Sequence, residues 1–142
     1  IYSVLGGAAS NYKFVHDFPE AAEGIMDCNH WFNPKSDLAL QRKKAAEAKG
    51  LVYTYEVFLT YNAVALLADA IDRAGSTDKE KVIEALASST WDKHGMPYGP
   101  TKFVNGQNEG AAPANTQVLG GQIEVIYPKE FASADAVFPM KS

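Results

Sequence analysis

The amino-acid sequence predicts an α/β fold in which strands come first, helices follow, and antiparallel strands close the chain. Short apolar segments at residues 1–5 and 25–28 are typical of buried strands. Between residues 56 and 74, apolar residues repeat at intervals of three and four, which predicts a long helix. Near the C-terminus, two β-rich runs flank Gly120-Gly121, which is the turn chemistry of a two-residue hairpin.

The N-terminal part is predicted to contain two strands connected through a loop of small residues. Residues 1–5 form the first strand and lead into Gly6-Gly7-Ala8-Ala9-Ser10, where glycine permits positive φ angles and close approach of other groups. Residues 12–23 give a mixed signal before the second strand. Residues 29–34 contain two large aromatic side chains, a proline and no regular period, so we expect a connection that crosses between structural units.

Helices are predicted next, each with signals at its ends. Ser36 is expected to cap a helix of residues 37–49. The long helix of residues 56–74 is expected to stop at Gly75. Thr77 and Glu80 form a capping box for a helix of residues 78–88. One face of the long helix is predicted to be apolar, with Val57, Tyr61, Val64, Ala68 and Ile71 on it.

The last third of the chain returns to strands. A strand at residues 101–104 precedes the turn signal Asn105-Gly106, and the hairpin strands are expected at residues 116–119 and 122–127, followed by an extended tail. These strands make a small sheet for the predicted helices, and the chain begins at Ile1 inside an apolar segment. We therefore expect a fragment whose N-terminal portion is missing.

Composition limits the function classes. An apolar fraction of 46% and a charged fraction of 21% are ordinary for a folded globular chain. The net charge of −4 gives no basic footprint, so we expect no nucleic-acid partner. The single cysteine, Cys28, excludes an intrachain disulfide. The sequence contains no apolar run of the length that would span a membrane.

The sequence lacks the motifs of common catalytic and cofactor sites. It has no Gly-x-Ser-x-Gly elbow, no dinucleotide fingerprint and no phosphate loop. Cys28 and His30 form a close pair of metal-ligating type, but no second pair accompanies them. We therefore expect no enzymatic activity, no metal and no cofactor.

The loop of small residues is the remaining candidate, because open α/β sheets bind ligands beyond the C-terminal ends of their strands. Backbone N–H groups at Gly6, Gly7 and Ala8, with the hydroxyl of Ser10, could hold a carboxylate. A tight connection without a ligand is the alternative, and the sequence leaves both open.

Several segments together resemble the branched-chain amino-acid-binding family of ABC-transporter solute receptors. The most specific is Tyr61-Asn62-Ala63-Val64-Ala65-Leu66-Leu67-Ala68-Asp69-Ala70-Ile71, which continues through Ala74-Gly75-Ser76-Thr77-Asp78 into Val82-Ile83-Glu84-Ala85-Leu86. Asn62 replaces an aspartate that is frequent in the family. The second is Phe103-Val104-Asn105-Gly106-Gln107-Asn108, followed by Gln117, Gly121, Val125-Ile126-Tyr127-Pro128 and Phe138-Pro139. The resemblance covers nearly the whole chain.

This resemblance implies an α/β chain that is the C-terminal fragment of a two-lobed type I periplasmic binding protein. Residues 1–28 would be the end of the second lobe, and residues 29–34 an interlobe crossover. Residues 35–100 would be a helical segment of the first lobe. Residues 101–142 would supply closing strands and a tail that return to the second lobe and the hinge.

The same resemblance implies a solute-binding subunit of an ABC importer that catalyses no reaction. It would capture a branched-chain amino acid, or a related small hydrophobic or aromatic carboxylate, by hinge closure. Its partners would be the solute, an ABC permease in the inner membrane and the remaining N-terminal part of the same protein. The expected location is the periplasm, or the cell exterior as a lipoprotein. The alternative is a ligand-sensing regulatory domain of the same fold in a signalling protein.

The ligand-binding residues expected from the loop and from the resemblance are Gly6, Gly7, Ala8, Ser10, Trp31, Tyr55 and Glu56. In amino-acid-binding members, the loop after the first strand supplies an acidic side chain to the ligand ammonium. That place falls at Gly6 or Gly7, where no carboxylate exists.

Two alternatives for the solute therefore stay open. Asp27 or Glu56 could hold an ammonium group, because a buried cation without a partner would cost several kcal/mol. Otherwise the solute has no ammonium and is a carboxylate that packs on Trp31, Tyr55 or Phe58.

Overall fold

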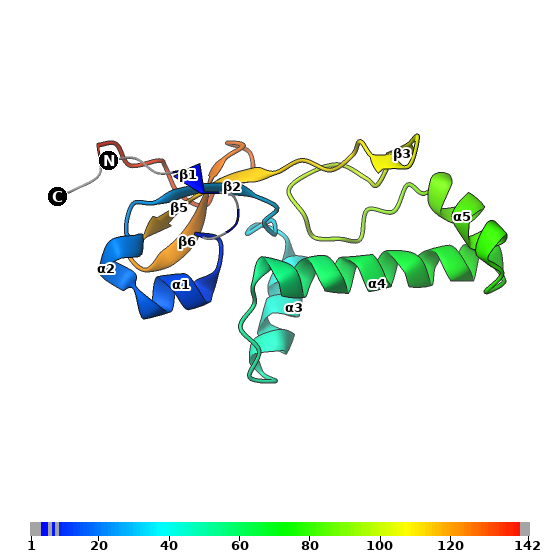
Figure 1. The fold of residues 1–142 in the computed structure, drawn as a ribbon, viewed down its shortest axis with the longest axis horizontal. Helices are drawn as coiled ribbons and strands as arrows, with labels where there is room; N and C mark the ends of the chain where they lie inside the picture. The colour runs from blue at the N-terminus through cyan, green and yellow to red at the C-terminus, as the bar shows by residue number, and fades with distance from the viewer. Residues whose placement is uncertain (1–3, 6, 8, 140–142) are drawn as a thin grey trace.

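The computed structural model of the chain describes residues 4, 5, 7 and 9–139, and its mixed α/β architecture confirms the predicted fold class. The elements separate into two units (Figure 1). The sheet unit contains β1, β2, β5, β6, α1 and α2, and the helical unit contains α3, α4, α5 and the β3–β4 hairpin.

The sheet unit is built on a sheet with strand order β1-β2-β5-β6 in the described residues. β1 (Val4–Leu5) runs parallel to β2 (Met26–Asn29), and β5 (Ala114–Leu119) pairs antiparallel with both β2 and β6 (Gln122–Tyr127). The predicted hairpin is confirmed: Gly120 and Gly121 close it with φ angles of 60° and 74°. Parallel pairing places the C-terminal ends of β1 and β2 at one edge of the sheet.

The segment with the mixed sequence signal forms two short helices, α1 (Tyr12–Asp17) and α2 (Pro19–Ala22), and α1 contacts β6. The side chain of Asn11 accepts a hydrogen bond from the N–H of Lys13 at 2.9 Å and so caps α1. Pro19 then starts α2, where the absence of an N–H group costs nothing.

The helices of the helical unit agree with the predicted ones to within about two residues. They are α3 (Asp37–Glu47), α4 (Tyr55–Ala74) and α5 (Lys79–Ala87). Ser36 caps α3 as predicted. The capping box predicted at Thr77 is wrong, because Asp78 is the N-cap of α5 and its carboxylate accepts from the next N–H groups.

The β3–β4 hairpin lies beside α5 at the far end of the helical unit (Figure 1). β3 (Phe103–Val104) pairs with β4 (Gln107–Asn108) around the predicted turn at Asn105-Gly106. The chain re-enters the sheet unit at Ala114. The hairpin thus stays with the helices, although its strands come after residue 101.

An aromatic junction joins the two units; it consists of Tyr12, Trp31, Phe32, Tyr53 and Phe58. Trp31 is only 1% exposed and lies in the connection between β2 and α3. Its ring centroid is 6.0 Å from that of Tyr12 on α1 and 5.6 Å from that of Phe58 on α4. The predicted crossing connection therefore carries the residue that packs against both units.

Arg42 fixes α3 to its neighbours within the helical unit. Its guanidinium donates to Asn62 Oδ1 at 2.9 Å and to the carbonyls of Lys93 at 2.8 Å and His94 at 3.1 Å. It also lies 4.4 Å from the ring centroid of Tyr61. This one side chain thereby holds α4 and residues 93–94 in place.

The predicted apolar face of α4 is exposed at its centre, where Tyr61 is 52% exposed and Val64 is 63% exposed. α4 projects away from the aromatic junction, and α5 covers only its C-terminal end, where Ala70 is buried (Figure 1). The apolar spacing is present, but the described residues place no element over its centre. Within these residues, no helix is both long and apolar enough to cross a membrane.

The exposed apolar face of α4 leads to a prediction about association. A purified protein of residues 1–142 should self-associate, because exposed contiguous apolar surface favours burial against another surface. The double variant Val64→Gln with Leu67→Gln should shift sedimentation velocity profiles toward monomer. Lys49→Gln, at an exposed position outside α4, is the matched control. A monomeric wild-type chain with a sharp thermal transition would contradict this expectation.

His94 leads to a second prediction, about pH. Burial lowers the pKa of His94 below its ordinary value of 6.5, and its ring accepts from the N–H of Met96 at 3.1 Å. The folded chain therefore prefers neutral His94. Its contribution to the free energy of unfolding is complete above about pH 6.5 and falls as pH drops toward the folded pKa.

The Tm should accordingly fall between pH 7.5 and 5.5 in wild type and fall less in His94→Gln, because only the unfolded chain gains a proton there. The exposed, non-titrating Thr90 is the control position, and Thr90→Gln should keep the wild-type pH dependence. Parallel Tm curves for wild type and His94→Gln would show that His94 is not responsible.

Candidate functional site

The candidate site is an open cleft between the sheet unit and the first turn of α4. Its volume is about 520 Å³, and it is lined by Gly7, Asn11, Lys13, Phe14, Asp17, Phe18 and Tyr55. The loop after β1 supplies Gly7, α1 and its flanking residues supply the next five, and Tyr55 begins α4. The cleft thus lies at the edge where the parallel strands β1 and β2 end.

Gly7 brings the backbone of the loop against both neighbours. Its φ angle is +100°, and a Cβ atom built there would lie 3.4 Å from Asn29 Nδ2 and 3.5 Å from the hydroxyl oxygen of Tyr55. Asn29 is the last residue of β2. The structure therefore brings the predicted residues Gly7 and Tyr55 together, and it adds Asn29 beside them.

The buried side chain of Asp27 on β2 holds this loop through hydrogen bonds. Its carboxylate, 1% exposed, accepts hydrogen bonds from the N–H groups of Gly7 at 2.9 Å and Ser10 at 2.9 Å, and from the Ser10 hydroxyl. It also accepts from the N–H of Cys28 at 2.8 Å. Asp27 is therefore occupied by the protein itself and does not face a ligand ammonium.

This arrangement corrects the role expected for Ser10. The side chain of Ser10 is fully buried, and both its N–H and its hydroxyl point to Asp27 instead of to a ligand carboxylate. The physical reason is that a buried carboxylate without hydrogen-bond donors is unstable, and Ser10 supplies two of the donors to Asp27. Gly6 and Ala8, the other predicted members of the loop, lie outside the described residues.

The expected aromatic residues divide between core and cleft. Trp31 and Phe58, 1% and 2% exposed, are packed in the aromatic junction, and neither lines the cleft. Tyr55 does line it. Hydrogen bonding to Glu56 raises the pKa of the Tyr55 hydroxyl, and the nearby charges of Glu56 and Asp27 add to this effect. Tyr55 is thus a neutral hydrogen-bond donor at the cleft.

Glu56 is exposed in the first turn of α4 and is not among the residues that line the cleft. Partial burial acts to raise the pKa of Glu56, but hydrogen bonds from Thr54, from its own backbone and from Tyr55 outweigh it and lower the pKa. Glu56 is therefore ionised and already has partners within its own turn.

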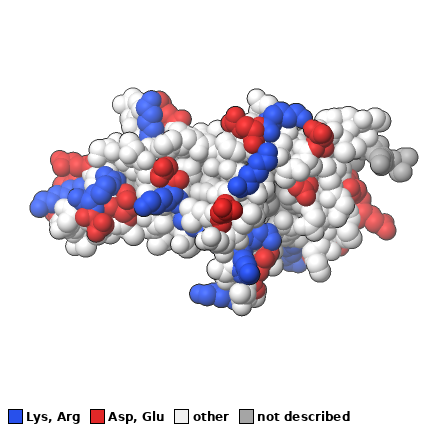
Figure 2. Space-filling model, turned by 180° about the vertical axis from the view of Figure 1, so that it is seen from behind, with Lys and Arg blue, Asp and Glu red and all other residues white. Residues whose placement is uncertain are grey.

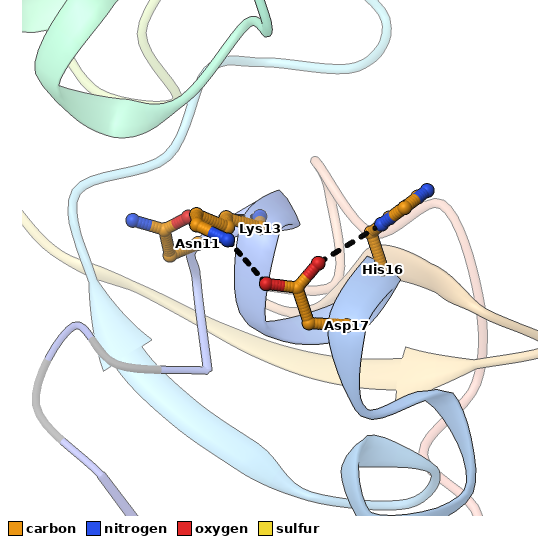
Figure 3. Close-up of polar contacts among 4 residues, drawn as sticks. All are labelled: Asn11, Lys13, His16 and Asp17. Atoms are coloured by element: carbon orange, nitrogen blue, oxygen red, sulfur yellow. Dashed lines mark hydrogen bonds and ion pairs between the residues drawn. The ribbon is translucent and has the colours of Figure 1, made fainter.

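One polar cluster on α1 is missed by the sequence reasoning. Asp17 lies between Lys13, which forms an ion pair with it, and His16, whose Nδ1 is 3.1 Å from Asp17 Oδ1 (Figure 3). Hydrogen bonds from Lys13 and then His16 lower the pKa of Asp17. The i,i+4 spacing of Lys13 and Asp17 could have revealed the pair, but residues 12–23 show no clear helical period.

The cleft is neither strongly charged nor built for a metal. The charges of Lys13 and Asp17 neutralise each other in an ion pair. The ring centroids of Phe14 and Phe18 lie 5.9 Å apart. On the reverse face of the molecule, basic and acidic side chains are interspersed (Figure 2). The described residues contain no group of three or more His, Cys, Asp or Glu side chains placed to hold a metal ion.

A second hollow of about 680 Å³ lies on the other side of Lys13 and Asp17. It is bordered by residues 50–53 between α3 and α4, by Lys43 and Glu47 of α3, and by the turn of the β5–β6 hairpin. Only one of the two hollows contains Gly7 and Tyr55.

Comparison with known proteins relates the fold to one architecture. No family model matches the chain, and no curated protein matches it. Among solved structures, it is similar to the leucine-binding protein LivK from Thermotoga maritima, with a TM-score of 0.70 and 22% sequence identity. The match covers 87% of this chain and 36% of LivK. The chain thus has the mixed α/β fold of part of a type I periplasmic binding protein.

The geometry at Gly7 leads to a prediction. Gly7→Ala should destabilise the protein by about 1–3 kcal/mol, because a side chain is strained at a φ of +100°. Gly99→Ala is the matched control, because a Cβ there meets nothing within 4 Å. Its effect should stay within about 0.5 kcal/mol. Equal unfolding free energies for the two variants in urea titrations would contradict the assignment.

Proposed function

We propose that this chain is part of a solute-binding receptor that captures a small molecule in the cleft and catalyses no reaction. The observation that carries the proposal is the meeting of the β1–β2 edge with the start of α4 across the cleft. Open α/β sheets bind ligands at such edges. The similarity to part of LivK, a leucine-binding protein, supports the same type of function.

The solute class follows from the lining of the cleft. Phe14, Phe18 and the ring of Tyr55 provide apolar surface for a hydrocarbon or aromatic group. The Tyr55 hydroxyl and the Lys13 ammonium provide donors for a carboxylate. A branched-chain amino acid, or a related hydrophobic or aromatic carboxylate, has both parts.

The two solute classes differ in the ammonium group, which needs an acidic side chain of the protein as its partner. Asp27 is saturated by four donor groups of the protein, whereas Asp17 and Glu56 are accessible but already paired. An amino acid would have to compete with Lys13 for Asp17, or with Tyr55 for Glu56. A carboxylate that accepts from the Tyr55 hydroxyl would likewise have to replace Glu56 as its acceptor, so both solute classes remain within the proposal.

Capture by closure is the proposed mechanism. The described chain passes between the sheet unit and the helical unit after Asn29 and again before Ala114. Rotation at these connections would open the cleft between Tyr55 and the Gly7 loop to admit a solute and then close it again. An ABC permease that recognises the closed form, the rest of a two-lobed receptor and a periplasmic or lipoprotein location complete the proposal.

Thermal-shift measurements on the protein that carries this chain test the proposal. L-leucine, L-isoleucine and L-valine form one series, and benzoate and phenylacetate form the other. A solute at 100 times its Kd should stabilise the protein by about 2.7 kcal/mol. Stabilisation by the amino acids alone would assign an ammonium site, and stabilisation by the aromatic acids alone would assign a site without one.

Two tyrosine-to-phenylalanine variants test whether the solute binds in this cleft. Tyr55→Phe should weaken binding about 2- to 10-fold, because it removes one hydrogen-bond donor. Tyr127→Phe, at an exposed position on β6, is the matched control and should bind as wild type does. The proposal is lost if no solute of either series stabilises the protein, or if Tyr55→Phe binds with unchanged affinity.

A further inference from the structure

We infer that Asp27 is the positioning residue of the cleft: it fixes Gly7 and Ser10 and thereby the wall that faces Tyr55. As far as a solute is concerned, this inference rests on the proposed function. Asp27 itself does not line the cleft. It acts from beneath the loop, as a buried side chain of β2.

The contacts of Asp27 join residues that are far apart in sequence. The nitrogen of Gly7 lies 2.9 Å from one carboxylate oxygen of Asp27 and 3.1 Å from the other. These hydrogen bonds join two residues that are 20 positions apart in the sequence. The N–H of Ser10, at 2.9 Å, and the Ser10 hydroxyl both donate to Oδ2. The N–H of Cys28 anchors Oδ1 at 2.8 Å on the strand itself.

Only a carboxylate satisfies all of these donors. A carboxylate accepts at both oxygens, whereas an amide has one accepting oxygen and an NH₂ group that would face N–H donors. Removal of the charge would therefore leave at least one buried N–H of the loop without an acceptor, and the loop would move to find water. The shape of the loop thus depends on the ionised side chain of Asp27.

The position of Gly7 transmits this effect to the cleft. A Cβ atom added to Gly7 would lie 3.5 Å from the Tyr55 hydroxyl oxygen and 3.4 Å from Asn29 Nδ2. Gly7 and Tyr55 line the same cleft, so a shift of the loop would move the wall that faces Tyr55. This wall lies between the two units, because Gly7 belongs to the sheet unit and Tyr55 to α4. Asp27 therefore sets the position of one wall of the cleft through its bonds to Gly7 and Ser10.

Amide hydrogen exchange and solute affinity together test the inference. In Asp27→Asn, the amides of Gly7 and Ser10 should exchange at least 10-fold faster, while the amides of Val118 and Val125 keep their wild-type rates. Affinity for L-leucine or benzoate, whichever binds wild type, should fall at least 10-fold. Asp72→Asn, on the exposed surface of α4, is the matched control and should change neither quantity.

A double variant separates positioning from general destabilisation. If Asp27 acts through the wall that faces Tyr55, the affinity losses of Asp27→Asn and Tyr55→Phe should not add when both changes are combined. If Asp27→Asn unfolds the whole chain, Ser10→Ala can be used instead, because this variant removes only the hydroxyl donor to Asp27. Amide exchange should then be about 3-fold faster at Gly7 and unchanged at Val118.

Each outcome decides the inference. Gly7 exchange within 2-fold of wild type in the folded variant overturns it, and so does a loosened loop with unchanged solute affinity or with additive losses. If neither L-leucine nor benzoate binds wild type, the proposed function fails for these solutes. In that case, the exchange rates still decide whether Asp27 sets the loop.

Discussion

The packing of Trp31 between Tyr12 and Phe58 is the interaction on which the rest of the structure depends. Trp31 lies in the connection between the two units and is 1% exposed, so it fixes α4 relative to α1 and the sheet. Offset and edge-on ring pairs of this kind contribute about 0.5–1.5 kcal/mol each beyond the area they bury. Because Tyr55 begins the same helix that carries Phe58, the aromatic junction also sets the width of the cleft.

The aromatic junction packs the two units together, and hydrogen bonds of polar side chains then fix the local geometry of their loops and helices. Asp27 ties the loop after β1 to β2, and Arg42 ties α3 to α4 and to residues 93–94. Each carries a buried or half-buried charge whose partners are mostly backbone groups, which fixes local geometry more firmly than an exposed ion pair. The Lys13–Asp17 pair, in contrast, lies on the surface of α1, where solvent weakens it and a solute can reach it.

The sequence predicts the elements better than the contacts between them. The extents of α3 and α4, the hairpin at Gly120-Gly121 and the crossing connection at Trp31 follow from local patterns. The apolar face of α4 also follows from its periodicity, but periodicity does not show which surface covers that face. For the site, Gly7 and Tyr55 are brought together as expected, whereas the buried position of Ser10 depends on Asp27, 17 residues away in sequence, and no local pattern encodes that contact.

The central claim is that the cleft between the Gly7 loop and Tyr55 receives the solute. A crystal structure of the protein grown with L-leucine or benzoate, whichever stabilises it, tests this most directly. The solute should touch Gly7 and the ring or hydroxyl of Tyr55, with Asp27 still bonded to Gly7 and Ser10. A solute seated instead in the hollow between α1 and residues 50–53, without contact to Tyr55, would contradict the claim.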